Sequence, residues 1–460
     1  MNIRNLIASL CILAASVSTA APKYVFYFIG DGMGMGQIMA AHTYNRVALG
    51  NNSGLLMNQF PYAGILTTYS ASSTVTDSAA AGTALATGHK TQNGMLGMDA
   101  DSVAVTSIAK TLHDKGWGVA LVTSVAPDDA TPGAFYAHVP YRGMYYEIGR
   151  QAADCGYEFI AGSTWRGAND KNNQPTDLLP YISSKGVDLV TSIPAAKASE
   201  SRRVFLYSDK PFNNSNIGFT IDSIPGALSL PDMTDAAIEH MKKVSPDKFF
   251  MMVEGGNIDH AGHGNDGATV ATEMINFNQA LAKAYDFYLQ HPDETVIIVT
   301  ADHETGGLSI GNGHVGYTSH TEYIPYQRMS KDMFSLQGAE LLKNGTPSWD
   351  EIKQFTAQRT GLWSHIPISE KQETKLKELY DKTITNHSEQ PNEKTLYASY
   401  SALASEIFRV LNTNQGFGWT TGGHSGNPVP VFAIGQGMEQ FATMLDNTAI
   451  APALLKLSLQ

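Results

Sequence analysis

Short runs of apolar, β-branched and aromatic residues recur along the chain, and polar or turn-forming residues bound each run. Runs of this length and composition are typical of strands that are buried on both faces of a sheet. We expect such strands at residues 24–29, 118–123, 204–207, 248–253, 295–300 and 429–434.

Segments with helical periodicity separate many of these runs. They lie at residues 102–115, 144–155, 235–244 and 269–289. Strands that alternate with helices predict an α/β fold, in which helices cover both faces of a mostly parallel central sheet.

Residues from about 312 to 418 differ from the rest of the chain, because they are more polar and mostly helical in pattern. We interpret this segment as an insertion that packs on the main domain. Two roles stay open for it, a cap near the functional site or a peripheral decoration. The expected organisation is a leader at residues 1–20 and one catalytic domain at 21–460 that carries the inserted helices.

The N-terminus has the pattern of a secretory signal peptide. Arg4 supplies a positive charge, residues 6–17 form a short apolar run, and small residues end at Ala20. The run is too short to span a bilayer comfortably. We therefore expect cleavage after Ala20 and an exported protein, periplasmic or secreted, without stable membrane insertion. A retained membrane anchor is the alternative.

Composition narrows the functional classes. The formal net charge of −12 argues against nucleic acid as a partner, and an anionic substrate would need local cations to attract it. Cys11 lies in the leader, so Cys155 has no partner for an internal disulfide in the mature chain.

Acidic residues and histidines follow the expected strands. Ligands of open α/β sheets bind outside the carboxyl ends of the strands. Five segments with acidic residues or histidines lie at expected strand ends or next to an expected strand. A single one of them would be compatible with a turn or a helix cap, but five together indicate one shared ligand site. The five segments are GDGMG (30–34), SVAPDDATP (124–132), EGGNIDHAGH (254–263), ADHETGG (301–307) and TTGGHSG (420–426).

The spacing of these residues favours metal ions. Asp259 and His263 are four residues apart, so on a helix they share a face and can bind one ion. Glu254, at the end of a strand, can reach a neighbouring ion. Asp302 and His303 are adjacent and need an irregular strand end to bind the same ion. Mixed oxygen and imidazole ligands suit zinc, whereas oxygen ligands alone suit magnesium.

The segment VTDSAAAGTALATGHKT (75–91) offers a possible nucleophile. It is compatible with a helix that Asp77 or Ser78 merely caps. Alternatively, Ser78 is a nucleophile at a helix N-terminus, where backbone N–H groups and the helix dipole favour an anion. The glycines before Lys90 and Thr91 do not have the spacing of a P-loop.

Taken together, these segments resemble the alkaline phosphatase family over most of residues 23–311 and again at about 418–435. The resemblance implies a three-layer α/β sandwich that hydrolyses a broad range of phosphate monoesters through a phosphoserine, with two zinc ions and one magnesium ion, as a homodimer. The motifs that carry it are GDGMG (30–34), VTDSAAAGTA (75–84), DDATP (128–132), HVPYR (138–142), VEGGNIDHAGH (253–263), TADH (300–303) and GGH (422–424).

The resemblance also implies a role for each matching residue. Ser78 corresponds to the phosphorylated nucleophile, and Arg142 to the arginine that clamps the phosphate. The implied ligands are Asp259, His263 and His424 for one zinc ion; Asp31, Asp302 and His303, with Ser78, for the second; and Asp31, Thr131 and Glu254 for magnesium. His260 and Asp129 stand at positions that influence magnesium affinity and phosphate release, which makes the affinity of the third site an open question.

Three other classes of protein compete with this interpretation. Sulfatases need a Cys/Ser-x-Pro-x-Arg context, whereas Ala-Ala-Ala-Gly follows Ser78. Phosphodiesterase-type or phosphonate-monoester relatives typically use threonine as the nucleophile and lack the magnesium ligands. A phosphate or metal scavenger without catalysis would need neither Ser78 nor Arg142.

Overall fold

The computed structural model describes residues 21–212, 215–343, 345–387 and 392–460, so the expected leader at 1–20 lies outside the described residues. Within the described ranges, one central sheet contains β1 (Tyr24–Ile29), β2 (Tyr62–Thr67), β3 (Gly118–Thr123), β4 (Phe159–Ala161), β5 (Asp188–Val190), β6 (Val204–Leu206), β7 (Phe249–Glu254), β8 (Thr295–Thr300), β15 (Val429–Ile434) and β16 (Met444–Asp446).

The strand order is β16-β2-β15-β8-β1-β7-β3-β4-β6-β5. Strand β15 runs antiparallel to β2 and β8, and the other described pairs of this sheet are parallel. The predicted mostly parallel sheet is therefore confirmed.

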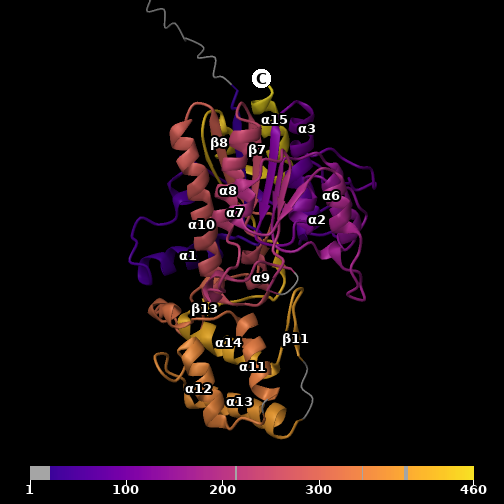
Figure 1. Cartoon of the computed structure of the whole chain (residues 1–460). Helices are drawn as coiled ribbons and strands as arrows, with labels where there is room; N and C mark the ends of the chain where they lie inside the picture. The colour runs from indigo at the N-terminus through magenta and orange to yellow at the C-terminus, as the bar shows by residue number, and fades with distance from the viewer. Residues whose placement is uncertain (1–20, 213–214, 344, 388–391) are drawn as a thin grey trace, which may run out of the picture.

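Helices pack on both faces of this sheet (Figure 1). On one face α10 contacts both α1 and α8, and on the other face α2, α3 and α15 contact one another. The helices of this layered part are α1 (Met35–Val47), α2 (Ser78–Thr87), α3 (Ile108–Asp114), α4 (Ala130–Gly133), α5 (Tyr145–Asp154), α6 (Leu178–Ser184), α7 (Ile193–Ala198), α8 (Leu230–Val244), α9 (Asn257–His263), α10 (Gly267–Gln290) and α15 (Ile450–Ser458).

Strand β1 is buried at every position, and helices pack against both of its faces. The ring of Phe28 packs edge-on against Phe277 of α10, at a centroid distance of 5.7 Å. The neighbouring Tyr27 points the opposite way and donates a hydrogen bond to the carbonyl oxygen of Leu85 in α2. Because successive side chains of a strand point to opposite faces, a strand between two helical layers needs apolar residues throughout.

The structure also corrects some expected boundaries. Helix α3 begins at Ile108 rather than at residue 102, because the hydroxyl of Ser107 caps it. Helix α8 begins at Leu230 rather than at residue 235, because Ser229 caps it and Pro231 suits its first turn. The short strands β2, β4, β5 and β16 were not predicted.

Beyond the sheet lies a second group of elements, the described residues between 331 and 415, which we call the helical unit. Figure 1 shows it at the end of the molecule where α9 lies. Its buried side chains form a hydrophobic cluster of their own, which includes Phe334, Leu376 and Phe408. Its elements are α11 (Lys331–Lys343), α12 (Trp349–Thr360), α13 (Glu370–Tyr380), α14 (Ala402–Gln415) and the hairpin of β11 (Glu393–Lys394) with β12 (Ser399–Tyr400).

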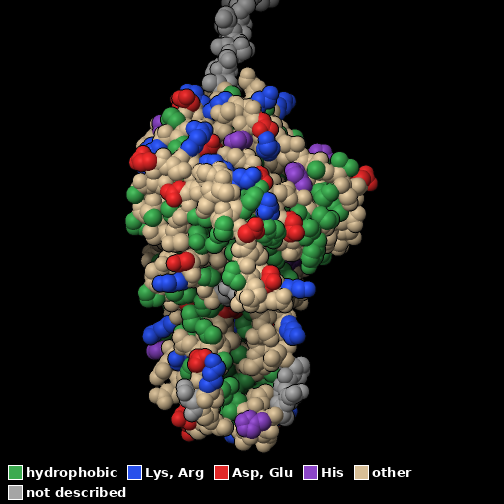
Figure 2. Space-filling view, turned by 45° about the vertical axis from the view of Figure 1, so that its right-hand side comes forward, with side chains coloured by type: hydrophobic (Ala, Val, Ile, Leu, Met, Phe, Trp, Pro, Cys, Tyr) green, Lys and Arg blue, Asp and Glu red, His purple; other side chains and the backbone are tan. Residues whose placement is uncertain are grey.

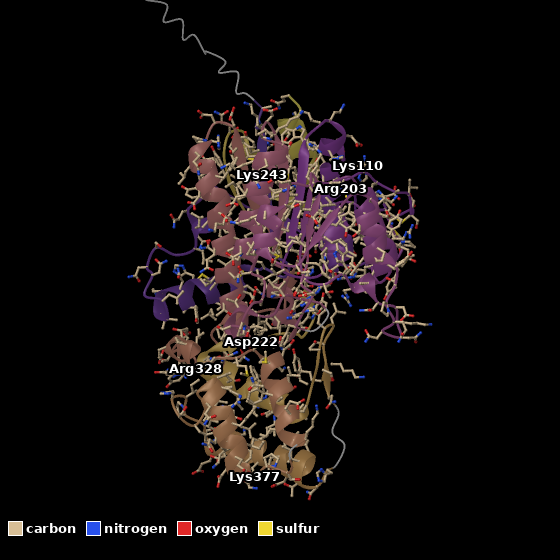
Figure 3. The ribbon with its side chains drawn as sticks, in the orientation of Figure 1. Lys110, Arg203, Asp222, Lys243, Arg328 and Lys377 are labelled. Atoms are coloured by element: carbon tan, nitrogen blue, oxygen red, sulfur yellow. The ribbon has the colours of Figure 1, made fainter. Side chains whose placement is uncertain are left out.

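Two carboxylates, Asp222 and Asp266, hold the chain where it enters the helical unit. Asp222, labelled at the junction in Figure 3, accepts hydrogen bonds from the backbone N–H (2.8 Å) and the hydroxyl (2.7 Å) of Ser330. Asp266 accepts hydrogen bonds from Gln327 (2.6 Å) and from the backbone N–H of Lys331 (2.7 Å). Two short antiparallel pairs complete the junction, β9 (Glu304–Thr305) with β14 (His424–Ser425) and β10 (Ser309–Ile310) with β13 (Phe417–Gly418).

The surface carries both signs of charge. Figure 2 shows Lys and Arg side chains mixed with Asp and Glu over one face, which is hollowed where the helical unit meets the layered part. Among the residues that the structure describes, no helix combines the length and the apolar character needed to cross a membrane.

Candidate active site

Most of the predicted site residues follow four neighbouring strands, β8, β1, β7 and β3, and lie at the carboxyl ends of these strands. The parallel register aligns Ile29 with both Thr300 and Glu254, and it aligns Glu254 with Thr123. Because the carboxyl ends of these strands lie at the same level, the segments that follow them converge.

The first candidate metal group comprises Asp31, Asp302 and His303, all buried. The Nε2 atom of His303 lies 3.3 Å from Oδ1 of Asp31 and 3.2 Å from Oδ2 of Asp302. Strand β8 ends at Thr300, so the chain is irregular where Asp302 and His303 follow. Asp302 is oriented through its Oδ1 atom, which accepts hydrogen bonds from the backbone N–H groups of Gly32 and His303.

The second group of ligands implied by the family resemblance comprises Asp259, His263 and His424. Helix α9 places Asp259 and His263 on one face, with Oδ2 and Nε2 3.4 Å apart. The pairing of β14 with β9 brings His424 beside Thr305. Its Nε2 atom lies 3.2 Å from Nε2 of His263 and 3.6 Å from Oδ1 of Asp259.

The two groups are neighbours. One donor atom each from Asp259, His303 and His424 also lies within 4.8 Å of the others. The rings of His303 and His424 stack at a centroid distance of 3.6 Å. His303 therefore lies between the two candidate ion positions.

The electrostatics of these groups fit divalent cations. One carboxylate oxygen of each of Asp31, Asp259 and Asp302 is buried without a hydrogen-bond donor. Burial, followed by repulsion from neighbouring carboxylates, raises the pKa of Asp31 well above its usual range and the pKa of Asp302 to about 7. A divalent cation stabilises the ionised form of such carboxylates, and a set of imidazole and carboxylate ligands suits zinc.

Glu254 and Thr131 supply oxygen atoms next to these groups. Glu254 is the buried last residue of β7, and Thr131 is buried in α4. Burial raises the pKa of Glu254 to about 8, although the hydroxyl groups of Thr123 and Thr131 lower it. Together with Asp31, they form an oxygen-only set of the kind that suits magnesium.

Ser78 lies at the N-terminus of α2, as expected. Asp77 caps this helix by accepting a hydrogen bond from the backbone N–H of Ala80 at 3.0 Å. The side chain of Ser78 is buried, and its Oγ atom lies 3.1 Å from Nε2 of His303. The hydroxyl group therefore faces the first candidate metal group from the positive end of a helix.

Arg142 lies between two carboxylates. Its Nη1 atom is 3.3 Å from Oδ2 of Asp77, and its Nη2 atom is 3.1 Å from Oδ1 of Asp129. Asp77 thus caps the helix that begins at Ser78 and also orients Arg142. Burial alone would raise the pKa of Asp129, but the guanidinium groups of Arg166 and then Arg142 hold it at about 2.

Two further residues border this site and carry no signal in the sequence, Arg166 and Tyr397. Arg166 follows β4 and pairs with Oδ2 of Asp129 at 3.2 Å. A strand of three residues is too short to recognise from its pattern, so the sequence does not place Arg166 at the end of a strand. Tyr397 lies in the hairpin of the helical unit and stacks on His260 at a centroid distance of 3.5 Å. No motif marks it.

Comparisons with known proteins place the chain in a family. The family model described as alkaline phosphatase matches residues 22–164 and 168–459. The chain is 30% identical to alkaline phosphatase 4 of Bacillus subtilis over 444 residues, which is 95% of this chain and 88% of the relative.

Solved structures show the same fold. The cold-active alkaline phosphatase from a psychrophilic Shewanella species superposes with a TM-score of 0.78 at 26% identity, over 94% of this chain and 99% of that chain. A mutant of the alkaline phosphatase from the Antarctic bacterium TAB5, with Mg bound in its M3 site, gives a TM-score of 0.65 at 24% identity, over 95% and 98% of the two chains.

Proposed function

Because the chain belongs to the alkaline phosphatase family, and is therefore an enzyme that hydrolyses phosphate monoesters, we propose that its reaction proceeds through a phosphoserine at Ser78. The observation that carries this proposal is the position of Ser78 Oγ. It lies at the N-terminus of α2 and 3.1 Å from Nε2 of His303, beside two groups of metal-ligand residues.

We assign two zinc ions and one magnesium ion to this site. Supporting observations are the mixed imidazole and carboxylate groups, the buried carboxylate oxygens without donors, and the magnesium in the TAB5 relative. When bound, the ions favour ionisation of the serine hydroxyl group and of water, and they stabilise the departing oxygen. The proposed ligands are Asp259, His263 and His424 for one zinc ion; Asp31, Asp302, His303 and Ser78 for the second; and Asp31, Thr131 and Glu254 for magnesium.

Residues of the chain would act in two displacements. In the first, Ser78 Oγ gives its proton to solvent and forms a bond to phosphorus while the bond from phosphorus to the alcohol oxygen breaks, and the alcohol leaves with a proton from solvent. In the second, water attacks phosphorus and the bond to Ser78 Oγ breaks, which releases inorganic phosphate. The N-terminus of α2 favours the negative charge near Ser78 in both steps.

Arg142 would bind the phosphoryl group. Its planar guanidinium can donate two parallel hydrogen bonds to two phosphoryl oxygens. Asp77 and Asp129 hold the guanidinium from the protein side, which reduces the freedom that it loses when substrate binds. The local cations thereby attract an anionic substrate to a protein whose net charge is −12.

Export and assembly belong to the same proposal. The signal-like pattern of residues 1–20 supports an exported protein, periplasmic or secreted. A homodimer follows from the family resemblance alone.

The proposal is tested by offering an aryl phosphate monoester, the corresponding diester and the aryl sulfate to the metal-replete protein at alkaline pH. We expect monoester hydrolysis to be far faster than the other two, to stop on chelation and to be nearly abolished in Ser78→Ala. The matched control Ser184→Ala, an exposed serine of α6, should keep full activity. Dominant diester or sulfate hydrolysis would overturn the assignment of Ser78 and Arg142.

A further inference from the structure

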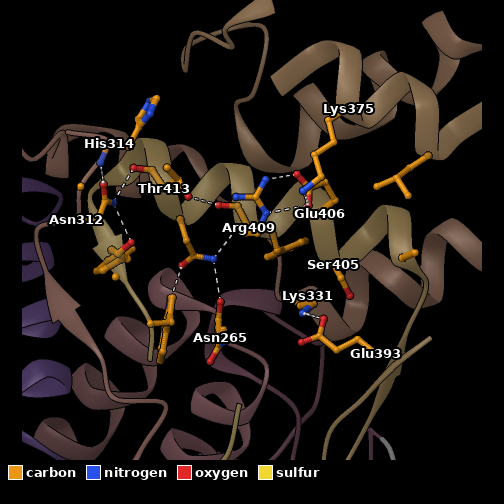
Figure 4. A pocket seen from close by; sticks show the side chains of 18 of the residues that line it. Asn265, Asn312, His314, Lys331, Lys375, Glu393, Ser405, Glu406, Arg409 and Thr413 are labelled. Atoms are coloured by element: carbon orange, nitrogen blue, oxygen red, sulfur yellow. Dashed lines mark hydrogen bonds and ion pairs between the residues drawn. The ribbon is translucent and has the colours of Figure 1, made fainter. Parts of the chain in front are cut away.

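Lys331 connects the hairpin of β11 and β12 to the C-terminal end of α9, the helix that carries Asp259 and His263. The buried Lys331 donates hydrogen bonds from Nζ to Glu393 (3.0 Å) and to the carbonyl oxygen of Gly264 (3.1 Å), as Figure 4 shows for the pair with Glu393. The same ammonium group lies over the ring of Tyr400, 4.1 Å from its centroid. Gly264 directly follows the proposed ligand His263, so the hairpin is held close to the site.

The loop of this hairpin carries Tyr397 onto the site. Its ring stacks on His260 at a centroid distance of 3.5 Å with an interplanar angle of 30°, and it forms an edge-to-face pair with His263 at a centroid distance of 5.5 Å. A side chain of the helical unit therefore contacts two residues of α9. This contact favours the cap among the two roles that the sequence leaves open for the inserted segment.

Tyr397 also forms part of the wall of a cavity of about 840 Å³. Aromatic side chains dominate the wall nearest the site, and they come from α5, from the segment after β4 and from the hairpin. The lining residues that the argument uses are Tyr145, Tyr146, Trp165, Arg166 and Tyr397. The cavity borders the proposed phosphate site, because Arg166 and Arg142 share the carboxylate of Asp129.

The charges around the cavity favour a neutral occupant. The guanidinium of Arg166 lies 3.9 Å from the centroid of the Tyr145 ring, and Asp129 balances its charge. The other charged residues of the lining are three carboxylates, Glu147, Asp170 and Asp177, and one cation, Lys171. A planar aromatic ring can stack on tyrosine and arginine surfaces, whereas a further anionic group would meet more carboxylates than cations.

We propose that this cavity is the leaving-group subsite, and that Tyr397 and Tyr145 bind a neutral, planar aromatic ring in the alcohol part of the monoester. The inference rests on the proposed function, since it extends the same site. Residues 165–167, which include Trp165 and Arg166 of this wall, fall between the two segments matched by the family model. The subsite is thus formed partly by residues outside the matched segments.

The test compares benzyl phosphate with cyclohexylmethyl phosphate, whose alcohols are similar in size and acidity and differ in aromaticity. We expect the wild-type enzyme to favour benzyl phosphate in kcat/KM by about 3- to 10-fold, which corresponds to one aromatic stacking contact. Tyr397→Ala should bring this ratio close to one, and Tyr397→Phe should preserve it. The control Tyr317→Ala, a fully exposed tyrosine, should leave the ratio unchanged.

Measuring inhibition by inorganic phosphate distinguishes an effect on the leaving-group subsite from an effect on the phosphate site. Phosphate has no leaving group, so any change of its inhibition constant in Tyr397→Ala measures an effect through His260 and His263, and it should be smaller than the change in the ratio of the two esters. An unchanged ratio in Tyr397→Ala overturns the proposal, and so does an equal loss for both esters or a loss of ratio in Tyr397→Phe. If the wild type hydrolyses neither ester but is active on a diester, the proposed function itself fails.

Discussion

The Nε2 atoms of His263 and His424 lie 3.2 Å apart, although the Nδ1 atom of each ring donates a hydrogen bond to a backbone carbonyl oxygen. The acceptors are Gly422, at 2.7 Å, and Thr76, at 2.8 Å. With Nδ1 protonated, the neutral rings direct two Nε2 lone pairs at the same point, beside the carboxylate of Asp259. A metal cation at this point accepts both lone pairs, and the two carbonyl groups orient the rings for it.

This relationship predicts the effect of removing one ring. His424→Ala should lose about one equivalent of zinc, with metal affinity reduced by at least about 10- to 100-fold and activity reduced with it. The measurement is metal content after dialysis, together with the rate of monoester hydrolysis.

The matched control for this prediction is His240→Ala. His240 is also buried, but its ring bonds the backbone carbonyl oxygen of Arg202, away from the metal-ligand groups. Full metal content in His424→Ala, or equal loss in both variants, would contradict the assignment of His424.

Arg142→Lys should weaken the binding of phosphate. Lysine keeps the positive charge but lacks the planar pair of donors, so we expect a loss of about 10- to 100-fold in kcat/KM, or about 1.5–3 kcal/mol. The inhibition constant for inorganic phosphate should rise in parallel. Arg150→Lys, which replaces an arginine that stacks on Tyr181, is the control and should change neither quantity. A variant Arg142→Lys with wild-type phosphate affinity would show that the arginine does not clamp the phosphate.

Glu273 predicts a pH dependence of stability. Burial raises its pKa from 4.5 to about 7, despite a hydrogen bond from the backbone N–H of Thr220. Between pH 4.5 and 7 the folded state therefore binds a proton that the unfolded state has released. The stabilisation is complete below pH 4.5 and is lost as the pH rises toward 7, so this group lowers the free energy of unfolding across the window by up to about 1.4 kcal/mol per pH unit.

Glu273→Gln should flatten this slope. Urea unfolding of metal-saturated protein at pH 5, 6 and 7 measures it, with Glu378→Gln, an exposed position of α13, as the control. A variant Glu273→Gln whose stability follows the wild-type pH curve would refute the raised pKa.

Replacing glycine by alanine should destabilise the protein more at Gly88, which ends α2, than at Gly116. Gly88 ends this helix at φ +79, and a Cβ atom there would lie 2.7 Å from Pro452. Gly116 has nearly the same φ, +78, with open space around it. Gly116→Ala should cost about 1–2 kcal/mol for the left-handed backbone alone. Gly88→Ala should cost more in thermal unfolding, and equal costs would show that Pro452 moves aside.

The sequence predicts the parts of this molecule that depend on local patterns. The strands at 24–29, 118–123, 295–300 and 429–434 are confirmed residue for residue, because a strand buried on both faces is apolar throughout. Strand β4 could not be predicted, because its three residues form no recognisable pattern. The start of α8 was not predicted, because Ser229-Leu230-Pro231 resembles a loop until the cap at Ser229 is seen.

The candidate site divides in the same way. Motif residues such as Asp259, His263 and Ser78 could be selected from spacing and resemblance, and the structure brings them together. The double contact of Asp77, with Ala80 and with Arg142, depends on how α2 packs against a loop 65 residues away. Tyr397 meets His260 only because a hairpin more than a hundred residues further along the chain folds back over α9. Such contacts leave no mark in local sequence.

The most direct test of the account is to trap the enzyme during turnover of a monoester by rapid acid quench and to map its peptides by mass spectrometry. The account predicts one phosphoryl group on the peptide that contains Ser78, on that serine, and none in Ser78→Ala. A phosphoryl group on a different residue, or wild-type turnover by Ser78→Ala, would contradict it.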